Sequence, residues 1–218
     1  DSRAAGQRAM IVTDIVEISK TKVEVCVDDD IRFALYKSEL RKYGIKKDSA
    51  LPVETYDEIM GEVLLKRAKL RCMNLLKSRD YTEYQLAAKL KQGCYPEEII
   101  DAAVAYVISY GYVDDMRYAR SYIEYASQSK SRRQIENDLI RKGISTDTIR
   151  QACEQCMDED SIANEEELIH KLLEKKHFDR QKATYKECQK LVGFLYRKGF
   201  ALDKIYRVIG NDGDWGPE

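Results

Sequence analysis

The sequence contains only two histidines, three prolines and one tryptophan among its 218 residues. No apolar run approaches the roughly 20 residues that span a bilayer, and the first residues lack the apolar core of a signal peptide. We therefore expect no membrane association and a cytoplasmic location. The scarcity of proline, together with 44% hydrophobic and 34% charged residues, is typical of a folded, helix-rich protein.

Motifs of common enzymes are also missing from the sequence. It has no P-loop, no nucleophile elbow and no dinucleotide-binding fingerprint. We therefore expect no enzymatic activity, no cofactor and no metal site. Asp114 and Asp115 precede an apolar helical pattern, so we expect them to cap a helix rather than to act as paired catalytic carboxylates.

Six cysteines are present, and without a secretory signal we expect them to be reduced thiols. Cys153 and Cys156 form a C-x-x-C pair, which can be a redox site or half of a zinc site. Both lie near the expected end of a helix, whereas redox pairs use a helix N-terminus to stabilise the thiolate. We favour a packing role for both cysteines, and a thiol-dependent enzyme is the least favoured function for this chain.

Three segments share one pattern around a short turn. When Cys94, Gly143 and Gly199 are aligned, the residue four places earlier is always leucine and the residue six places later is always isoleucine. This spacing predicts two amphipathic helices joined by a tight turn, in which glycine adopts a left-handed conformation. The matched residues are Leu86, Ile135 and Leu191; Leu90, Leu139 and Leu195; Tyr95, Ile144 and Phe200; Ile100, Ile149 and Ile205; and Val104, Cys153 and Ile209.

Each of these pairs is preceded by another helical pattern, so the repeating unit has three helices. Thr82 with Gln85, and Ser131 with Gln134, have the spacing of capping boxes at the starts of the middle helices. The first repeat departs from the pattern because its glycine, Gly93, stands one place before the turn position.

The segments 10–18, 22–28 and 31–36 are rich in β-branched residues and are separated by short polar turns, which predicts a small antiparallel sheet. A short helix ending near Gly44 should follow. The expected fold is mainly α, with three tandem three-helix repeats preceded by a small antiparallel β-rich N-terminal module. The expected parts are a disordered or engineered remnant at 1–9, the β-rich module at 10–56, repeats at 57–110, 111–157 and 158–210, and a tail at 211–218.

The stretch 111–144 resembles the RecX family of recombinase regulators. It contains a Gly-Tyr-Val-Asp-Asp turn at 111–115, the pair Tyr118-Ala119, a basic segment at 130–133, and a leucine followed by Lys142-Gly143. The segment LAAKLKQGCYPEEII resembles the first-repeat motif, although the family usually has Lys-Gly where this chain has Gly93-Cys94. The β-rich opening resembles an extension of many low-GC bacterial members, so the resemblance covers about residues 10–209.

The resemblance implies a protein that binds in the groove of a RecA filament on DNA, inhibits the RecA ATPase and strand exchange, and restrains the SOS response. The rival hypothesis is a helical-repeat module that binds nucleic acid without RecA. Because no base-reading motif is present, we expect only weak, non-specific DNA binding by the isolated protein, which we expect to be a monomer.

The net charge of −1 hides a strong segregation of charge. Residues 66–79 hold six cations and no acid, whereas residues 154–167 hold seven acids and no base. Solvated lysines and arginines are common on helices, so a purely structural role is an equal alternative for the basic runs. The candidate contacts to a partner or to DNA are Lys66, Arg67, Lys69, Arg71, Lys130, Arg132, Arg133, Arg141, Lys142, Lys182, Lys186, Lys190, Arg197 and Lys198.

Fifteen tyrosines could also provide surfaces for base stacking. Tyr118 and Tyr122 have the spacing of a buried helix face, so we expect these two to pack in the core.

Overall fold

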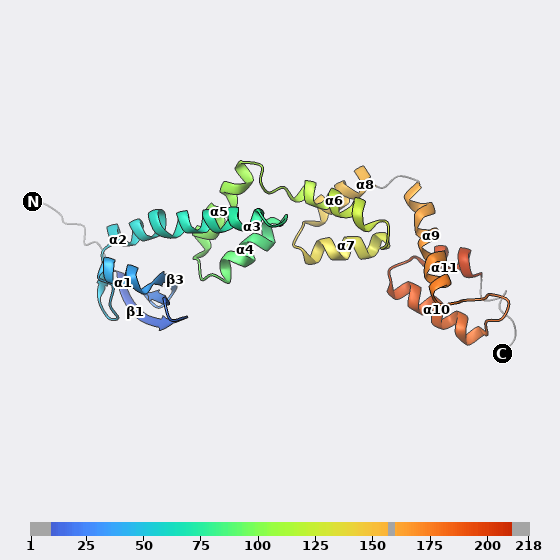
Figure 1. Cartoon of the computed structure of the whole chain (residues 1–218), viewed down its shortest axis with the longest axis horizontal. Coiled ribbons are helices and arrows are strands. Elements are labelled where there is room, and N and C mark those ends of the chain that lie inside the picture. The colour runs from blue at the N-terminus through green and yellow to red at the C-terminus, as the bar shows by residue number, and fades with distance from the viewer. Residues whose placement is uncertain (1–9, 157–159, 211–218) are drawn as a thin grey trace, which may run out of the picture. The chain divides into compact units, whose positions relative to one another are not determined.

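The computed structural model describes residues 10–156 and 160–210 (Figure 1). The expected remnant at 1–9 and the expected tail at 211–218 lie outside this part of the chain. The chain divides into two compact units, Asp1–Asp114 and Asp115–Glu218.

The first unit opens with a four-stranded antiparallel sheet in the order β3-β2-β1-β4. The strands are β1 (Met10–Glu17), β2 (Lys22–Val27), β3 (Ile31–Tyr36) and β4 (Ala50–Leu51). The three predicted strands are therefore confirmed, and the short β4 was missed. The helix α1 (Lys37–Tyr43) ends at Gly44, whose φ of +64° is the left-handed conformation of a helix C-terminus.

Pro52 precedes one long helix that contains α2 (Val53–Glu58), the π-helical segment η1 (Ile59–Leu65) and α3 (Lys66–Leu76). The π-helical segment was not predicted. Two further helices, α4 (Glu83–Lys91) and α5 (Glu97–Ser109), pack together and against α3 (Figure 1). The capping box of Thr82 and Gln85 is confirmed at the start of α4.

The sheet and the first repeat share one hydrophobic core. Its largest fully buried side chains include Phe33 and Leu35 from β3, Leu64 from η1, and Leu86 and Leu90 from α4. Because the inner face of the sheet is covered by the repeat, neither part has a separate core in this unit.

The second unit contains two three-helix groups, each with its own core. The first group comprises α6 (Asp115–Ala126), α7 (Arg132–Arg141) and α8 (Thr146–Cys156). The second comprises α9 (Asp160–Lys175), α10 (Tyr185–Arg197) and α11 (Leu202–Ile209). Leu139 and Ile149 are buried in the first core, and the matched residues Leu195 and Ile205 are buried in the second, as the repeat pattern predicted.

The aligned turn positions share one backbone geometry. Gly143 and Gly199 have φ values of +83° and +90°, and Cys94, which is not a glycine, has a φ of +57°. The amide of the following residue donates to the carbonyl of the leucine four places before the turn, as in Ile144 to Leu139 at 3.2 Å and Phe200 to Leu195 at 3.3 Å. This is the Schellman motif, which is frequently accompanied by an apolar contact between those two residues, and both positions are apolar in all three repeats.

Candidate partner-binding surface

The basic helix α3 holds four of the predicted contact residues, and three of them are engaged within the first unit. Lys66 pairs with Glu62, and Arg67 pairs with Glu39 of α1 while its guanidinium lies 4.8 Å from the ring centre of Tyr36. The ammonium of Lys69 lies 4.3 Å from the ring centre of Tyr106 on α5. Arg71 is exposed and forms no ion pair with a described residue.

Arg67 therefore has a structural role. Its partner Glu39 also accepts a hydrogen bond of 2.8 Å from the Tyr36 amide at the start of α1. Arg67 and Glu39 are both largely buried, so this ion pair ties the long helix to the β-rich module.

In the middle repeat, the carboxylate of Asp138 on α7 neutralises part of the predicted basic cluster. It accepts hydrogen bonds from Lys130 at 2.5 Å and from the Tyr122 hydroxyl at 2.7 Å, and it also pairs with Arg141. Burial raises the pKa of Asp138, but the hydrogen bonds from Lys130, Tyr122 and Arg141 outweigh this effect and lower the pKa to about 2. Lys130 and Arg141 are thus held by an internal carboxylate.

Tyr122 and Tyr118 pack partly buried against the middle-repeat core, in agreement with the sequence pattern. The ammonium of Lys142 lies 5.3 Å from the ring centre of Tyr122 and 5.7 Å from that of Tyr118. Lys142 therefore covers the outer side of these rings as a cation–π partner.

Arg132 and Arg133 begin α7 at the contact with the third repeat. The Arg132 side chain pairs with Glu136 at 2.8 Å, and its backbone amide donates to Glu165 of α9 at 2.7 Å. Arg133 is exposed, and its guanidinium lies 5.8 Å from the ring centre of Tyr196 on α10. Ser131, which caps α7, donates its hydroxyl to the Lys198 carbonyl at 2.8 Å.

The third repeat presents cations along one face of α10. Lys186, Lys190 and Arg197 are exposed and form no ion pair with a described residue. Their spacing places them on the same side of the helix, with Gly193 between the last two. The ammonium of Lys198 instead lies 5.3 Å from the ring centre of Phe194.

The predicted stripe of three lysines on this helix needs one correction. Lys182 is not part of it, because α10 begins at Tyr185 and Lys182 lies in the preceding turn, where it pairs with Asp179 at 3.2 Å. The helix starts there because Thr184 caps it in a full capping box with Glu187, a signal present in the sequence that we did not use.

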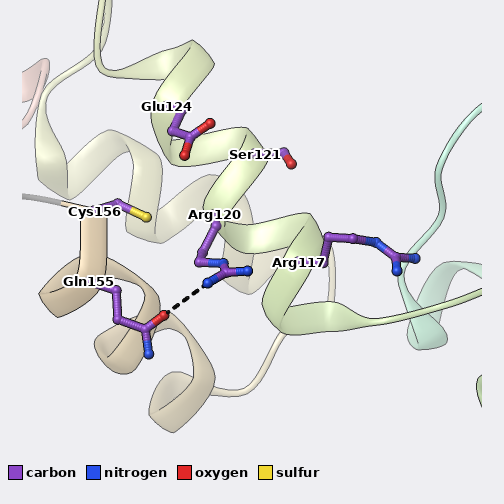
Figure 2. A pocket seen from close by; sticks show the side chains of 6 residues that line it. All are labelled: Arg117, Arg120, Ser121, Glu124, Gln155 and Cys156. Carbon is purple, nitrogen blue, oxygen red and sulfur yellow. Dashed lines mark hydrogen bonds between the residues drawn. The ribbon is translucent and has the colours of Figure 1, made fainter. Parts of the chain in front are cut away.

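A small hollow of about 370 Å³ lies between α6 and α8 (Figure 2). Arg120 donates a hydrogen bond of 3.4 Å to Gln155 across it, whereas the Arg117 side chain points away from Cys156 (Figure 2). Burial and the carboxylate of Glu124 raise the pKa of the Cys156 thiol. The hollow is lined by Arg117, Arg120, Ser121, Glu124, Gln155 and Cys156.

The C-x-x-C pair has the environment of packed thiols. Cys153 is fully buried at the matched repeat position, and burial raises its pKa, so both sulfurs stay protonated near neutral pH. Within residues 10–156 and 160–210, no cluster of three or more His, Cys, Asp or Glu side chains could hold a metal ion. No helix in the same ranges is long and apolar enough to cross a membrane.

Comparison with known families matches all three repeats. The models for the first, second and third three-helix domains of RecX match residues 68–106, 114–152 and 164–209. The regulatory protein RecX of Caldanaerobacter subterraneus subsp. tengcongensis is 31% identical, over 92% of this chain and 98% of its own length. This chain belongs to the RecX family. The regulatory protein RecX of Clostridium perfringens strain SM101 is 32% identical, over 89% of this chain and 92% of its own length.

Solved structures of RecX proteins have the same fold. A crystal structure of a regulatory protein RecX matches with a TM-score of 0.60 at 24% identity, over 92% of this chain and 98% of the other. The crystal structure of RecX from Lactobacillus salivarius gives a TM-score of 0.57 at 22% identity, over 67% of this chain and 94% of the other. The predicted fold class, with three tandem three-helix repeats after a small antiparallel sheet, is therefore confirmed.

Proposed function

We propose that this RecX-family chain binds the RecA filament assembled on DNA, inhibits its ATPase and its recombinase and coprotease activities, and thereby restrains the SOS response. The observation that carries the proposal is the match of all three tandem domains to RecX, whose curated relatives are named regulatory proteins. The chain would act as a non-enzymatic monomer in the cytoplasm.

The charge distribution supports a filament as the partner. A nucleoprotein filament presents many regularly spaced phosphates and carboxylates, so a matching surface should have several cations that internal acids leave unneutralised. Lys186, Lys190 and Arg197 on α10 meet this requirement best among the candidates in the second unit. The nearby carboxylate of Glu187 accepts a 2.9 Å hydrogen bond from the Thr184 amide, which commits it to the helix cap.

The test is an assay of RecA ATPase on single-stranded DNA with this protein titrated in. We expect the parent protein to inhibit, and the triple variant Lys186→Gln, Lys190→Gln, Arg197→Gln to need about tenfold more protein for half inhibition, because charge contacts at an interface contribute on the order of 1–3 kcal/mol in total. A matched control is Arg150→Gln with Lys171→Gln, two exposed cations of the same unit that pair with Asp147 and Glu167 on their own helices.

The possible outcomes separate the alternatives. If the parent does not inhibit but binds DNA tightly without RecA, the rival function of an independent nucleic-acid-binding module is correct. If the triple variant inhibits as well as the parent, α10 is not the contact. The next variant is then Arg132→Gln with Arg133→Gln, because reversal of Arg132 to Glu would place like charge beside Glu136 and Glu165 and disturb the fold.

A further inference from the structure

Three tyrosine rings at the end of α5 form a continuous surface ladder. The ring centres of Tyr106 and Tyr110 are 4.9 Å apart, and those of Tyr110 and Tyr112 are 6.2 Å apart with an angle of only 18° between the planes. Tyr106 packs partly against the core, whereas Tyr110 is 63% exposed and Tyr112 is 48% exposed. The outer two rings are therefore flat, nearly parallel and accessible to a ligand.

The backbone holds the ladder in place. The helix α5 is capped by Tyr110, and Gly111 follows with a φ of +70°. The Gly111 amide donates to Ile108 at 2.8 Å and the Tyr112 amide donates to Val107 at 3.0 Å, which is the same Schellman motif as in the repeat turns. In those three turns the matched residue after the left-handed position is buried, whereas Tyr112 is not. About half of the Tyr112 side chain therefore stays accessible to a ligand.

The helix that packs beside the ladder is basic, and the nearest acids in the sequence, Asp114 and Asp115, follow Tyr112 at the start of α6. Residues 102–113 carry no charged side chain, and α3, which packs against α5, carries none that is negative. Lys69 of α3 already lies over Tyr106 at 4.3 Å from the ring centre. Lys66, which pairs with Glu62, and Lys77, which directly follows α3, have the helical spacing of the same face. Aromatic rings beside a row of cations are the combination that binds unpaired nucleotides.

We infer that Tyr110 and Tyr112 stack on unpaired bases of a single-stranded nucleic acid whose phosphates contact the cations of α3. Stacking uses the π face that every base has, so the binding is independent of sequence. The site lies in the first unit and needs no RecA, so it is distinct from the α10 surface of the proposed function. It would distinguish single strands from a duplex, in which the bases are already stacked and paired.

The experiment measures fluorescence anisotropy of a labelled single-stranded DNA of mixed sequence with the full chain and without RecA. We expect the double variant Tyr110→Leu, Tyr112→Leu to bind this DNA more weakly than the parent. Each ring removed should weaken binding by about five- to tenfold, because the base stacked on that ring loses its contact. The control is Tyr125→Leu in the second unit, since Tyr125 is 77% exposed and forms no ring contact with another described residue. Far-ultraviolet circular dichroism should be unchanged in both variants because these side chains lie at the surface.

A second measurement leaves the protein unaltered. Replacing the central nucleotides of the probe by abasic sites keeps every phosphate and removes the bases, so the parent should bind this probe more weakly and the tyrosine double variant should bind both probes equally. Duplex binding should not differ between the parent and the double variant. The inference is overturned if the double variant binds the single strand as the parent does, or if it loses RecA inhibition alone, which would make the ladder a protein contact.

Discussion

Gly199 is the position where one added methyl group should disturb two repeats. Its φ of +90° is a conformation that other residues adopt only with strain, and an added Cβ would lie 2.7 Å from the Ser131 hydroxyl oxygen and 3.2 Å from the Cβ of Arg133. Ser131 is fully buried, caps α7 by accepting from the Gln134 amide at 3.3 Å, and donates to the Lys198 carbonyl. Gly199→Ala should therefore displace the cap of the neighbouring repeat.

The expected cost has two parts. The left-handed conformation costs alanine about 1–2 kcal/mol, and loss of the Ser131 cap adds about 1–2 kcal/mol. The free energy of unfolding of the second unit should therefore fall by about 2–4 kcal/mol. Gly44→Ala is the matched control, because Gly44 ends a helix at a φ of +64° with no atom within 4 Å of the added Cβ. It should cost only the conformational part, about 1–2 kcal/mol.

Urea denaturation gives the free energies, and hydrogen exchange locates the damage. We expect Gly199→Ala to reduce amide protection at Gln134 and Ile135, which lie in the preceding repeat, as well as at Phe200. If the loss of protection stays within residues 184–209, or if the two glycine variants cost the same, the contact between Ser131 and the Gly199 turn does not join the repeats.

Three further predictions concern the core, pH and the thiols. Leu195→Ala should destabilise the second unit by about 2–5 kcal/mol in urea denaturation, because Leu195 is fully buried, whereas Leu202→Ala at a 45% exposed position should cost under about 1 kcal/mol. Since the pKa of Asp138 is lowered to about 2, its contribution of about 2 kcal/mol should be present above pH 4 and lost between pH 4 and 2; acid denaturation of Asp138→Asn should lack this component. Cys153→Ala with Cys156→Ala should reduce stability but leave inhibition of RecA ATPase by the remaining folded protein unchanged, and loss of inhibition at equal folded concentration would support a thiol-dependent activity.

Local sequence patterns were sufficient to predict most of the secondary structure. The strands, the helix pairs and the caps at Thr82 and Ser131 depend on neighbours only a few residues away, so periodicity and capping signals reveal them. The aligned leucines and the apolar residues after each turn follow from the Schellman motif, which is also local. In the first repeat the glycine, Gly93, stands one place before the aligned turn position. The left-handed conformation nevertheless stays at the aligned position, where Cys94 adopts it.

The roles of the charged and aromatic residues were decided only by tertiary structure. Nothing in the sequence pairs Arg67 with Glu39, 28 positions away, or brings Lys69 of α3 over Tyr106 of α5. Asp138 neutralises Lys130 because the chain folds back between α6 and α7, and so a run of cations in the sequence is not a basic surface in the fold. The contacts that decide whether a cation is available, such as Arg67 with Glu39 and Lys69 with Tyr106, join segments distant in sequence, whereas turns and caps form between neighbours. This is why the sequence determined the repeats but not the surfaces they present.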